Sequence, residues 1–198
     1  MAVDRGATLE VRQAARRRDL LAAGIALLGD PAGPAVTVRA VCRRAGLTER
    51  YFYESFADRD EFVRSVYDEV GARAQDVLVG AVSRGGRGSR ERATAAVEAF
   101  VALMVDQPEM GRVLLLTPLT ESALNGRGMA LMPAFVTLVH DQLSGVPDAD
   151  EKQMTAIGVV GALSSLFIAL LDGTIGAPRE RFVAHCVELV AGADTTRG

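Results

Sequence analysis

The residues of this chain best suited to chemistry are threonine, arginine and tyrosine side chains that recur between positions 37 and 59. Hydroxyl and guanidinium groups bind DNA phosphates, and arginine also hydrogen-bonds to base edges in the major groove. We expect Arg50 and Tyr51 to reach base edges, whereas Tyr53 and Arg59 contact phosphates. The predicted DNA contacts are Arg16, Arg17, Thr37, Arg39, Thr48, Arg50, Tyr51, Tyr53 and Arg59.

Other chemistries find little support. The sequence has no nucleophile elbow, paired-acid motif or cofactor fingerprint, and no group of His, Cys and carboxylates has metal-site spacing, so neither a cofactor nor a metal is expected. Asp106, Glu109 and Glu121 could act as acid or base in a small α-helical enzyme, a minor alternative. Cys42 and Cys186 are far apart and no signal peptide is seen, which predicts reduced, buried thiols in a cytoplasmic protein.

Two short helices joined by a tight turn are predicted to position these side chains. Thr37 can cap a helix that ends at Gly46, because glycine adopts the left-handed turn without a steric penalty. Thr48 repeats the capping signal two residues later. Phe52 and Phe56 lie four residues apart, so they share the buried face of the second helix and leave its polar residues outside. The pattern predicts a DNA-binding helix-turn-helix.

This stretch resembles the DNA-binding domain of the TetR (tetracycline-repressor-like) family of bacterial transcription regulators. The resemblance covers about twenty-five residues: the Thr-Val-Arg start at 37–39, Ala-Gly-Leu-Thr at 45–48, the aromatic residues at 53 and 56, and Asp-Arg-Asp-Glu-Phe at 58–62. It implies a homodimer paired through its last two helices and a pseudo-palindromic double-stranded operator. Glu49 and Arg50 depart from the residues often found after the turn, so operator preference does not carry over.

The rest of the chain is predicted to be all-α. A flexible arm over 1–11 should precede a helix-turn-helix domain over 12–57 and a helical regulatory and dimerisation domain over 58–198. In the cluster containing Arg16 and Arg17, the arginines are either a solvated face or a phosphate clamp. The net charge of −3 argues against a general nucleic-acid coat, but residues 1–67 carry 11 arginines against 9 acidic residues, as a DNA-binding end requires. A long helix opened by Asp58 should link the two domains.

Residues 154–171 form an uncharged apolar run long enough to cross a membrane. Gly158, Gly161, Ser164 and Ser165 interrupt the run, and Asp172 follows at once, so a membrane span is the weaker interpretation. A helix apolar on all sides must be buried all round. We therefore expect it to be buried at a twofold interface, with the last helix beside it.

The central helices are the expected location of a small-molecule site. Flexible apolar side chains could line a pocket there, and a few polar groups could orient a ligand. Packing in an ordinary core is the competing interpretation for each of them. The predicted ligand contacts are Phe100, Met104, Met110, Leu114, Asn125, Met132, Phe135 and His140, with Thr137 and Gln142 as further polar groups.

These features together predict a dimeric, one-component transcriptional regulator. We expect a repressor that leaves its operator when a small apolar or amphipathic effector fills the second domain. A DNA-binding regulator without an inducer is the first alternative. A protein-interaction or membrane-surface module that uses the long apolar helix is the second.

Overall fold

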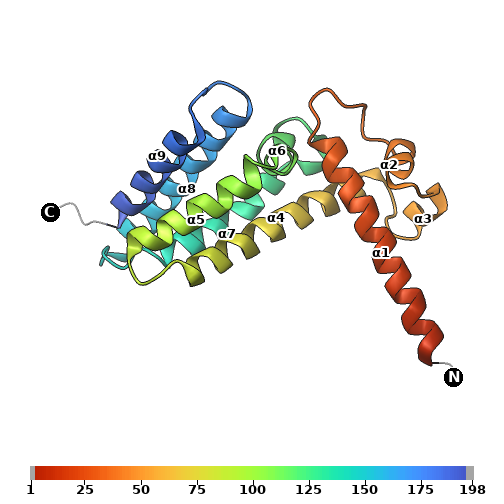
Figure 1. The fold of residues 1–198 in the computed structure, drawn as a ribbon, viewed down its shortest axis with the longest axis horizontal. Helices are drawn as coiled ribbons and strands as arrows, with labels where there is room; N and C mark the ends of the chain where they lie inside the picture. Colours follow the sequence, from red (N-terminus) through yellow and green to blue (C-terminus); the bar gives the residue numbers. More distant parts are fainter. Residues whose placement is uncertain (1–2, 195–198) are drawn as a thin grey trace.

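Every secondary-structure element in the computed structural model, which describes residues 3–194, is helical. The prediction of an all-α fold is confirmed for these residues. In Figure 1, α1, α2 and α3 gather at one end, α5 and α7 pack along the rest of α4, and α8 and α9 pack on α7 and α5. The elements are α1 (Val3–Leu28), α2 (Val38–Ala45), α3 (Glu49–Tyr53), α4 (Arg59–Arg84), α5 (Ser89–Met104), α6 (Pro108–Gly111), η1 (Arg112–Leu116), η2 (Thr117–Leu119), η3 (Ser122–Leu124), α7 (Arg127–His140), α8 (Ala149–Leu171) and α9 (Arg179–Ala193).

Helix α1 begins at Val3, so the prediction of a loose arm is wrong for residues 3–11 and for the other residues lies outside the described part of the chain. Leu9 and Val11 on this extension are 54% and 66% exposed. Apolar periodicity reports burial, and these turns lie beyond the core although their backbone continues the helix. A helix that projects past its packing surface therefore carries no periodic signal in its sequence.

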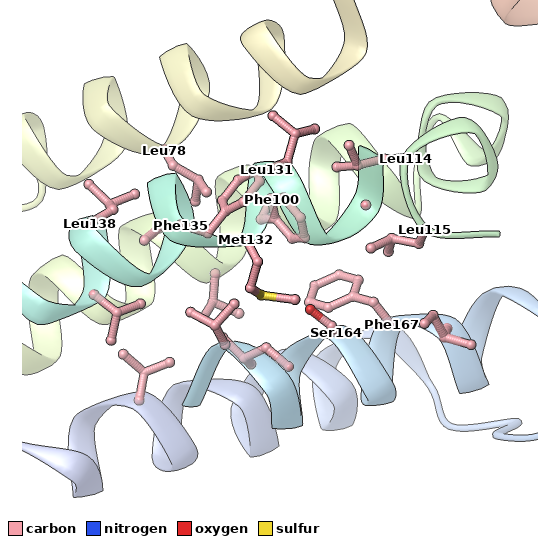
Figure 2. A pocket seen from close by; sticks show the side chains of 18 of the residues that line it. Leu78, Phe100, Leu114, Leu115, Leu131, Met132, Phe135, Leu138, Ser164 and Phe167 are labelled. Atoms are coloured by element: carbon pink, nitrogen blue, oxygen red, sulfur yellow. The ribbon is translucent and has the colours of Figure 1, made fainter. Parts of the chain in front are cut away.

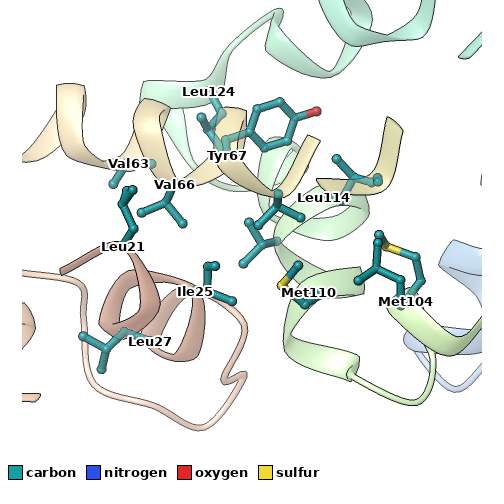
Figure 3. Packing of buried hydrophobic residues seen from close by; sticks show 14 of the residues in the cluster. Leu21, Ile25, Leu27, Val63, Val66, Tyr67, Met104, Met110, Leu114 and Leu124 are labelled. Atoms are coloured by element: carbon teal, nitrogen blue, oxygen red, sulfur yellow. The ribbon is translucent and has the colours of Figure 1, made fainter. Parts of the chain in front are cut away.

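Helix α4 is shared by the two halves of the molecule. Asp58 caps its first turn by accepting a hydrogen bond from the Glu61 amide at 2.7 Å, as the sequence predicts. Its buried residues run from Phe62 to Ala81, so one helix contributes to the cores of both halves. Figure 3 shows the junction, where Leu21 and Ile25 of α1 face α4, with Met110 and Leu114 alongside.

The segment from α6 to η3 is irregular. Helix α6 passes into a π-helical turn and then into two short 3-10 turns. Pro118 accounts for the break, because proline has no amide hydrogen to donate and clashes with the preceding turn of a helix. The Thr117 amide closes the π-helical turn on the Arg112 carbonyl, and the buried Thr117 hydroxyl donates to the same carbonyl at 3.0 Å.

Helix α8 packs on α7 and α9 through one side and leaves apolar residues on the other (Figure 1). By length and composition it could cross a membrane, but only 22% of its most apolar window is buried in the chain. Met154 and Ile157 are 65% and 51% exposed, and no atom lies within 4 Å of where a side chain on Gly158 or Gly161 would begin. The helix is therefore not enclosed by its own chain.

Candidate nucleic-acid interface and effector cavity

The helix-turn-helix forms as the capping residues predict. The Thr37 hydroxyl accepts a hydrogen bond from the Ala40 amide at 3.2 Å, and Gly46 ends α2 in the left-handed conformation with φ of 66°. Thr48 occupies the position before α3, but its side chain makes no capping hydrogen bond. The prediction that Thr48 caps α3 through its side chain is therefore wrong, and its hydroxyl is exposed.

Helix α3 is a single turn held from beneath by aromatic rings. Phe52 is fully buried, and its ring centroid lies 5.5 Å from that of Phe56 and 5.2 Å from that of Phe62. The helix ends at Tyr53, three residues before Phe56, and the amides of Ser55 and Phe56 both donate to the Phe52 carbonyl in the turn that follows. Burial of these rings fixes the orientation of α3 on α1 and α4.

Helix α1 braces α3 through Arg16. The Arg16 guanidinium lies over the Tyr51 ring at 4.0 Å from its centroid, and its Nη1 is 3.6 Å from Glu54 Oε2. Arg50 Nε donates to the other oxygen of Glu54 at 2.9 Å. Arg17 lies over the Phe56 ring at 5.0 Å. Arg16 and Arg17 thus cover the aromatic rings of Tyr51 and Phe56. A contact between either arginine and a DNA phosphate stays a prediction.

Four of the predicted DNA contacts share exposed positions on α2 and α3. Arg39 and Arg50 have side chains 89% and 83% exposed, and Tyr53 is 57% exposed. Thr48 is exposed between them, whereas Tyr51 is half-buried under Arg16. An interface built from these groups offers two cations and two hydroxyls, which suits phosphate and base-edge contacts.

Arg59 is paired with other residues of the chain, although its side chain is 36% exposed. Its guanidinium forms a two-pronged ion pair with Glu121 at 3.0 and 2.5 Å, and its Nε donates to the Val36 carbonyl at 2.9 Å. A third carboxylate contact, to Asp60, is 3.0 Å long. The hydrogen bond to Glu121 raises the Arg59 pKa, and the same bond lowers the pKa of Glu121. A phosphate contact at Arg59 stays a prediction, for a guanidinium whose three nitrogens already have partners within the chain.

A cavity of about 460 Å³ lies between α4, α5, α7 and α8. Figure 2 shows Leu78 and Leu138 toward one end and Leu114 and Leu115 toward the other, with Met132 between them. Its lining is overwhelmingly apolar, and the volume falls within the usual range for small-molecule sites. The arrangement suits an elongated apolar ligand.

The predicted ligand contacts divide into two groups. Phe100, Leu114, Met132 and Phe135 line the cavity, as does Gln142. The other five, Met104, Met110, Asn125, Thr137 and His140, do not line it. Met104 and Met110 belong to the buried junction with α1 and α4 (Figure 3). Asn125 and Thr137 are exposed, and His140 lies 3.5 Å from Asp141.

Sequence analysis missed several cavity residues because their patterns had another explanation. Tyr67 and Leu78 belong to α4, which was read as a mechanical link, and Ser164 and Phe167 belong to the presumed dimer helix α8. A helix that is apolar all round can serve two surfaces at once. Because residues 154–171 are apolar on all sides, the sequence did indicate that this helix packs against a second apolar surface besides the predicted dimer interface.

The residues of the enzyme alternative do not converge. Asp106 is ion-paired with Arg179, and Glu121 with Arg59; in each case the hydrogen bond lowers the carboxyl pKa, so neither group is adapted to hold a proton. Within residues 3–194 no three His, Cys, Asp or Glu side chains form a metal-binding group. Both cysteines are free and buried, and burial raises the pKa of each.

Comparison with known proteins finds structural but not sequence relatives. No family model and no curated protein matches the chain. Among solved structures, the fatty acid degradation regulator FadR from Bacillus halodurans superposes with a TM-score of 0.75 at 12% identity, covering 88% of this chain and 97% of its own. A TetR-like regulator from Rhodococcus sp. RHA1 gives 0.69 at 18% identity over 88% and 93%. A TetR family regulator from Marinobacter aquaeolei VT8 gives 0.67 at 18% over 93% and 97%.

Proposed function

We propose that this chain, which has the fold of the solved TetR-family regulators, is a sequence-specific DNA-binding transcriptional regulator. The observation that carries the proposal is the turn at Gly46, which sets α2 and α3 so that Arg39, Thr48, Arg50 and Tyr53 form one exposed polar surface. Recognition helices of this kind enter the major groove with their N-terminal residues at the bases. The structural likeness to described transcriptional regulators supports the same conclusion. A regulator of this kind acts in the cytoplasm.

Fluorescence anisotropy with duplexes tiled across the upstream region of the protein's own gene tests the proposal, with a scrambled duplex as the control. We expect saturable binding to one tile, tighter than to scrambled DNA by a factor of about a thousand or more, with two chains per site. Selection from random DNA covers an operator located elsewhere. Failure of both experiments to yield any preferred sequence would refute the proposal.

We further infer that the cavity holds an effector whose binding releases the operator, so that the protein acts as a repressor. Leu119 and Leu124 line the cavity on either side of Glu121, and Glu121 holds Arg59 at the start of α4. Arg59 in turn holds the Val36 carbonyl, next to the residue that caps α2. A ligand that displaces η2 and η3 can therefore tilt α4 and the helix-turn-helix together. Addition of an effector should then raise the operator Kd.

The dimer is proposed to form through α8 and α9. The exposed residues Met154 and Ile157 and the open positions at Gly158 and Gly161 allow two helices to approach closely. A twofold interface would bury this apolar face and set two α3 helices for a pseudo-palindromic site. A membrane-surface module would bury the same face in lipid, and it predicts association with vesicles in place of a discrete dimer.

A further inference from the structure

The end of the cavity nearest the DNA-binding half is formed by the start of α7. Gly126 precedes this fourteen-residue helix with φ of 78°, and no side chain caps its first turn. Gly126 and Gly128 both line the cavity. The first amides of a helix have no partner within it and carry partial positive charge, so they favour an acceptor oxygen or an anion. Two glycines leave the backbone accessible to such a group.

Tyr67 supplies an independent observation at the same place. The residue is 2% exposed and lines the cavity, and its hydroxyl lies 3.8 Å from where a side chain on Gly128 would begin. Figure 3 shows its ring on the side of α4 away from Leu21. No hydrogen bond to this hydroxyl is formed by residues 3–194, although every fully enclosed side-chain nitrogen or oxygen among them has a partner. The hydroxyl therefore borders the open space and presents an unused donor.

The remainder of the cavity suits a chain of methylenes. From Tyr67 to Val82 it follows α4 for fifteen residues, or about 22 Å at the rise of an α-helix. Its middle is lined by Phe100, Met132 and Phe167, and the Ser164 hydroxyl is the polar group that Figure 2 shows there. A ligand that fits this space has one polar end and a long apolar body.

We propose that the cavity binds a single-chain aliphatic carboxylic acid, with its carboxylate at the start of α7 and at the Tyr67 hydroxyl and its alkyl chain toward Leu78 and Leu138. The proposal rests on the proposed function, because it names the effector class of that same cavity. Oxygen atoms of the carboxylate accept from Tyr67 and from the free amides of the first turn. Asp68 is close enough to affect Tyr67, but it is ion-paired with Arg127, which offsets its repulsion of an anion.

The opposite orientation is less favourable. Arg92 lies at the far end, where its Nε donates to Gln142 Oε1 at 2.9 Å and its Nη1 to the Arg87 carbonyl at 2.7 Å, so two of its three nitrogens are engaged. Asp194 also lines that end, and its carboxylate would repel an anion. Burial and the Asp68 charge raise the pKa of Tyr67 to about 12, so its hydroxyl keeps its proton and donates at neutral pH.

Isothermal titration calorimetry on the purified full-length chain tests the assignment with three probes of equal length: dodecanoate, dodecan-1-ol and dodecyltrimethylammonium. We expect dodecanoate to bind most tightly. Tyr67→Phe should weaken dodecanoate about tenfold or more, the usual effect of losing a hydrogen bond to a charged group, and leave the cationic probe unchanged. Thr137→Ala removes an exposed hydroxyl of α7 that does not line the cavity and is the matched control, with dodecanoate binding within about twofold of the original chain.

Two further measurements separate head-group recognition from general damage to the cavity. Gly128→Ala places a methyl group 3.5 Å from Pro118 and 3.8 Å from the Tyr67 hydroxyl, an ordinary contact that the fold tolerates, and should weaken dodecanoate. In the original chain, shortening the acid should weaken binding about fourfold for each methylene removed, as expected for burial of the chain.

Several results would overturn the assignment. Equal losses for all three probes in Tyr67→Phe would mean that the tyrosine only shapes the cavity, and tighter binding of the cation would place the head group at Asp194. Failure of any acid to bind also overturns it. Operator binding, measured without ligand on the same preparations, keeps the two proposals distinct. Selective DNA binding without dodecanoate binding refutes the acid site alone, whereas dodecanoate binding without any operator refutes the regulator alone.

Discussion

Glu54 forms ion pairs with both Arg16 and Arg50, and the two arginines differ in how much of the side chain is exposed. Arg16 has a side chain only 24% exposed and stacks on Tyr51, so its position is fixed by the fold. Arg50 is 83% exposed, and its pairing with Glu54 is a surface contact between residues four apart on the helix. Such pairs contribute only about 0.3–0.5 kcal/mol, so DNA can displace Glu54 from Arg50 at little cost. Arg50 is therefore the more available guanidinium for base reading.

Replacing Arg50 with alanine should weaken binding to the preferred operator by about 1–3 kcal/mol and relax the discrimination among operator variants, because a base contact is lost. Arg39→Ala is the matched control, since Arg39 is equally exposed but lies on α2. It should weaken all sequences alike and lower the salt slope by about one. Anisotropy titrations against a panel of single-base operator variants measure both effects. An unchanged ranking of that panel with Arg50→Ala would exclude a base-reading role.

At the scale of elements, the Arg59–Glu121 pair connects the loop before α2, the start of α4 and η3. The Arg59 hydrogen bond lowers the pKa of Glu121 in the folded chain, so the pair stabilises the fold fully above the unfolded pKa of about 4.3. That stabilisation is lost as pH falls through the lower, folded pKa. Because the Arg59 side chain is 36% exposed, we expect the ion pair to contribute about 1 kcal/mol to the stability of the fold.

Glu121→Gln should therefore lower the Tm at pH 7, and its difference from the original chain should shrink as the pH is lowered below about 4. Thermal unfolding followed by circular dichroism across this pH range measures the difference. Asp106→Asn, which breaks the exposed pair with Arg179, is the control for operator affinity and should leave it unchanged. Glu121→Gln should change operator affinity, because it releases the link to Val36. A Tm difference independent of pH would show that the charge of Glu121 is not what stabilises the contact.

The crossing of α1 and α4 depends on Gly24. A side-chain carbon at that position would lie 2.6 Å from both Phe62 and Val66, which are fully buried. Gly24→Ala should therefore destabilise the chain by about 1–3 kcal/mol despite the better helix propensity of alanine. Chemical denaturation measures the change. Gly80→Ala on α4 is the comparison, since its added carbon would meet only the flexible end of the Arg84 side chain, at 3.1 Å. If both substitutions changed the free energy of unfolding equally, α1 and α4 would be able to move apart and accommodate the added methyl group at little cost.

The sequence predicted the elements best where local chemistry decides them. Thr37, Gly46 and Asp58 are capping residues whose effect does not depend on the rest of the chain, and all three end or begin helices as predicted. Local sequence patterns could not predict ion pairs between distant parts of the chain. Arg59, for example, pairs with Glu121, 62 residues away. Met104 shows the same limit, because apolar spacing cannot distinguish the wall of a cavity from the core behind it.

At the scale of the whole molecule, the outer face of α8 leaves the apolar residues Met154 and Ile157 unburied. The other side of α8, with Leu163, Ser164 and Phe167, lines the cavity, so α8 separates the cavity from the outer face. Contiguous apolar residues exposed on one helix face are typical of an interaction site. If that site is the twofold interface, dimerisation also fixes the outer wall of the cavity, and ligand affinity should depend on the dimer.

Replacing Ile157 with lysine should therefore convert the protein to a monomer, because a charge would be buried against the same apolar face of the partner. Val79→Lys is the control, since Val79 is 52% exposed and Ile157 51%, and Val79 lies on α4. Sedimentation velocity should give a dimer for the control and a monomer for Ile157→Lys, with operator affinity lost only in the latter. If Ile157→Lys stayed dimeric, the chains would pair through another surface. If it became monomeric but kept full affinity for a two-half-site operator, the distance between recognition helices would not depend on α8.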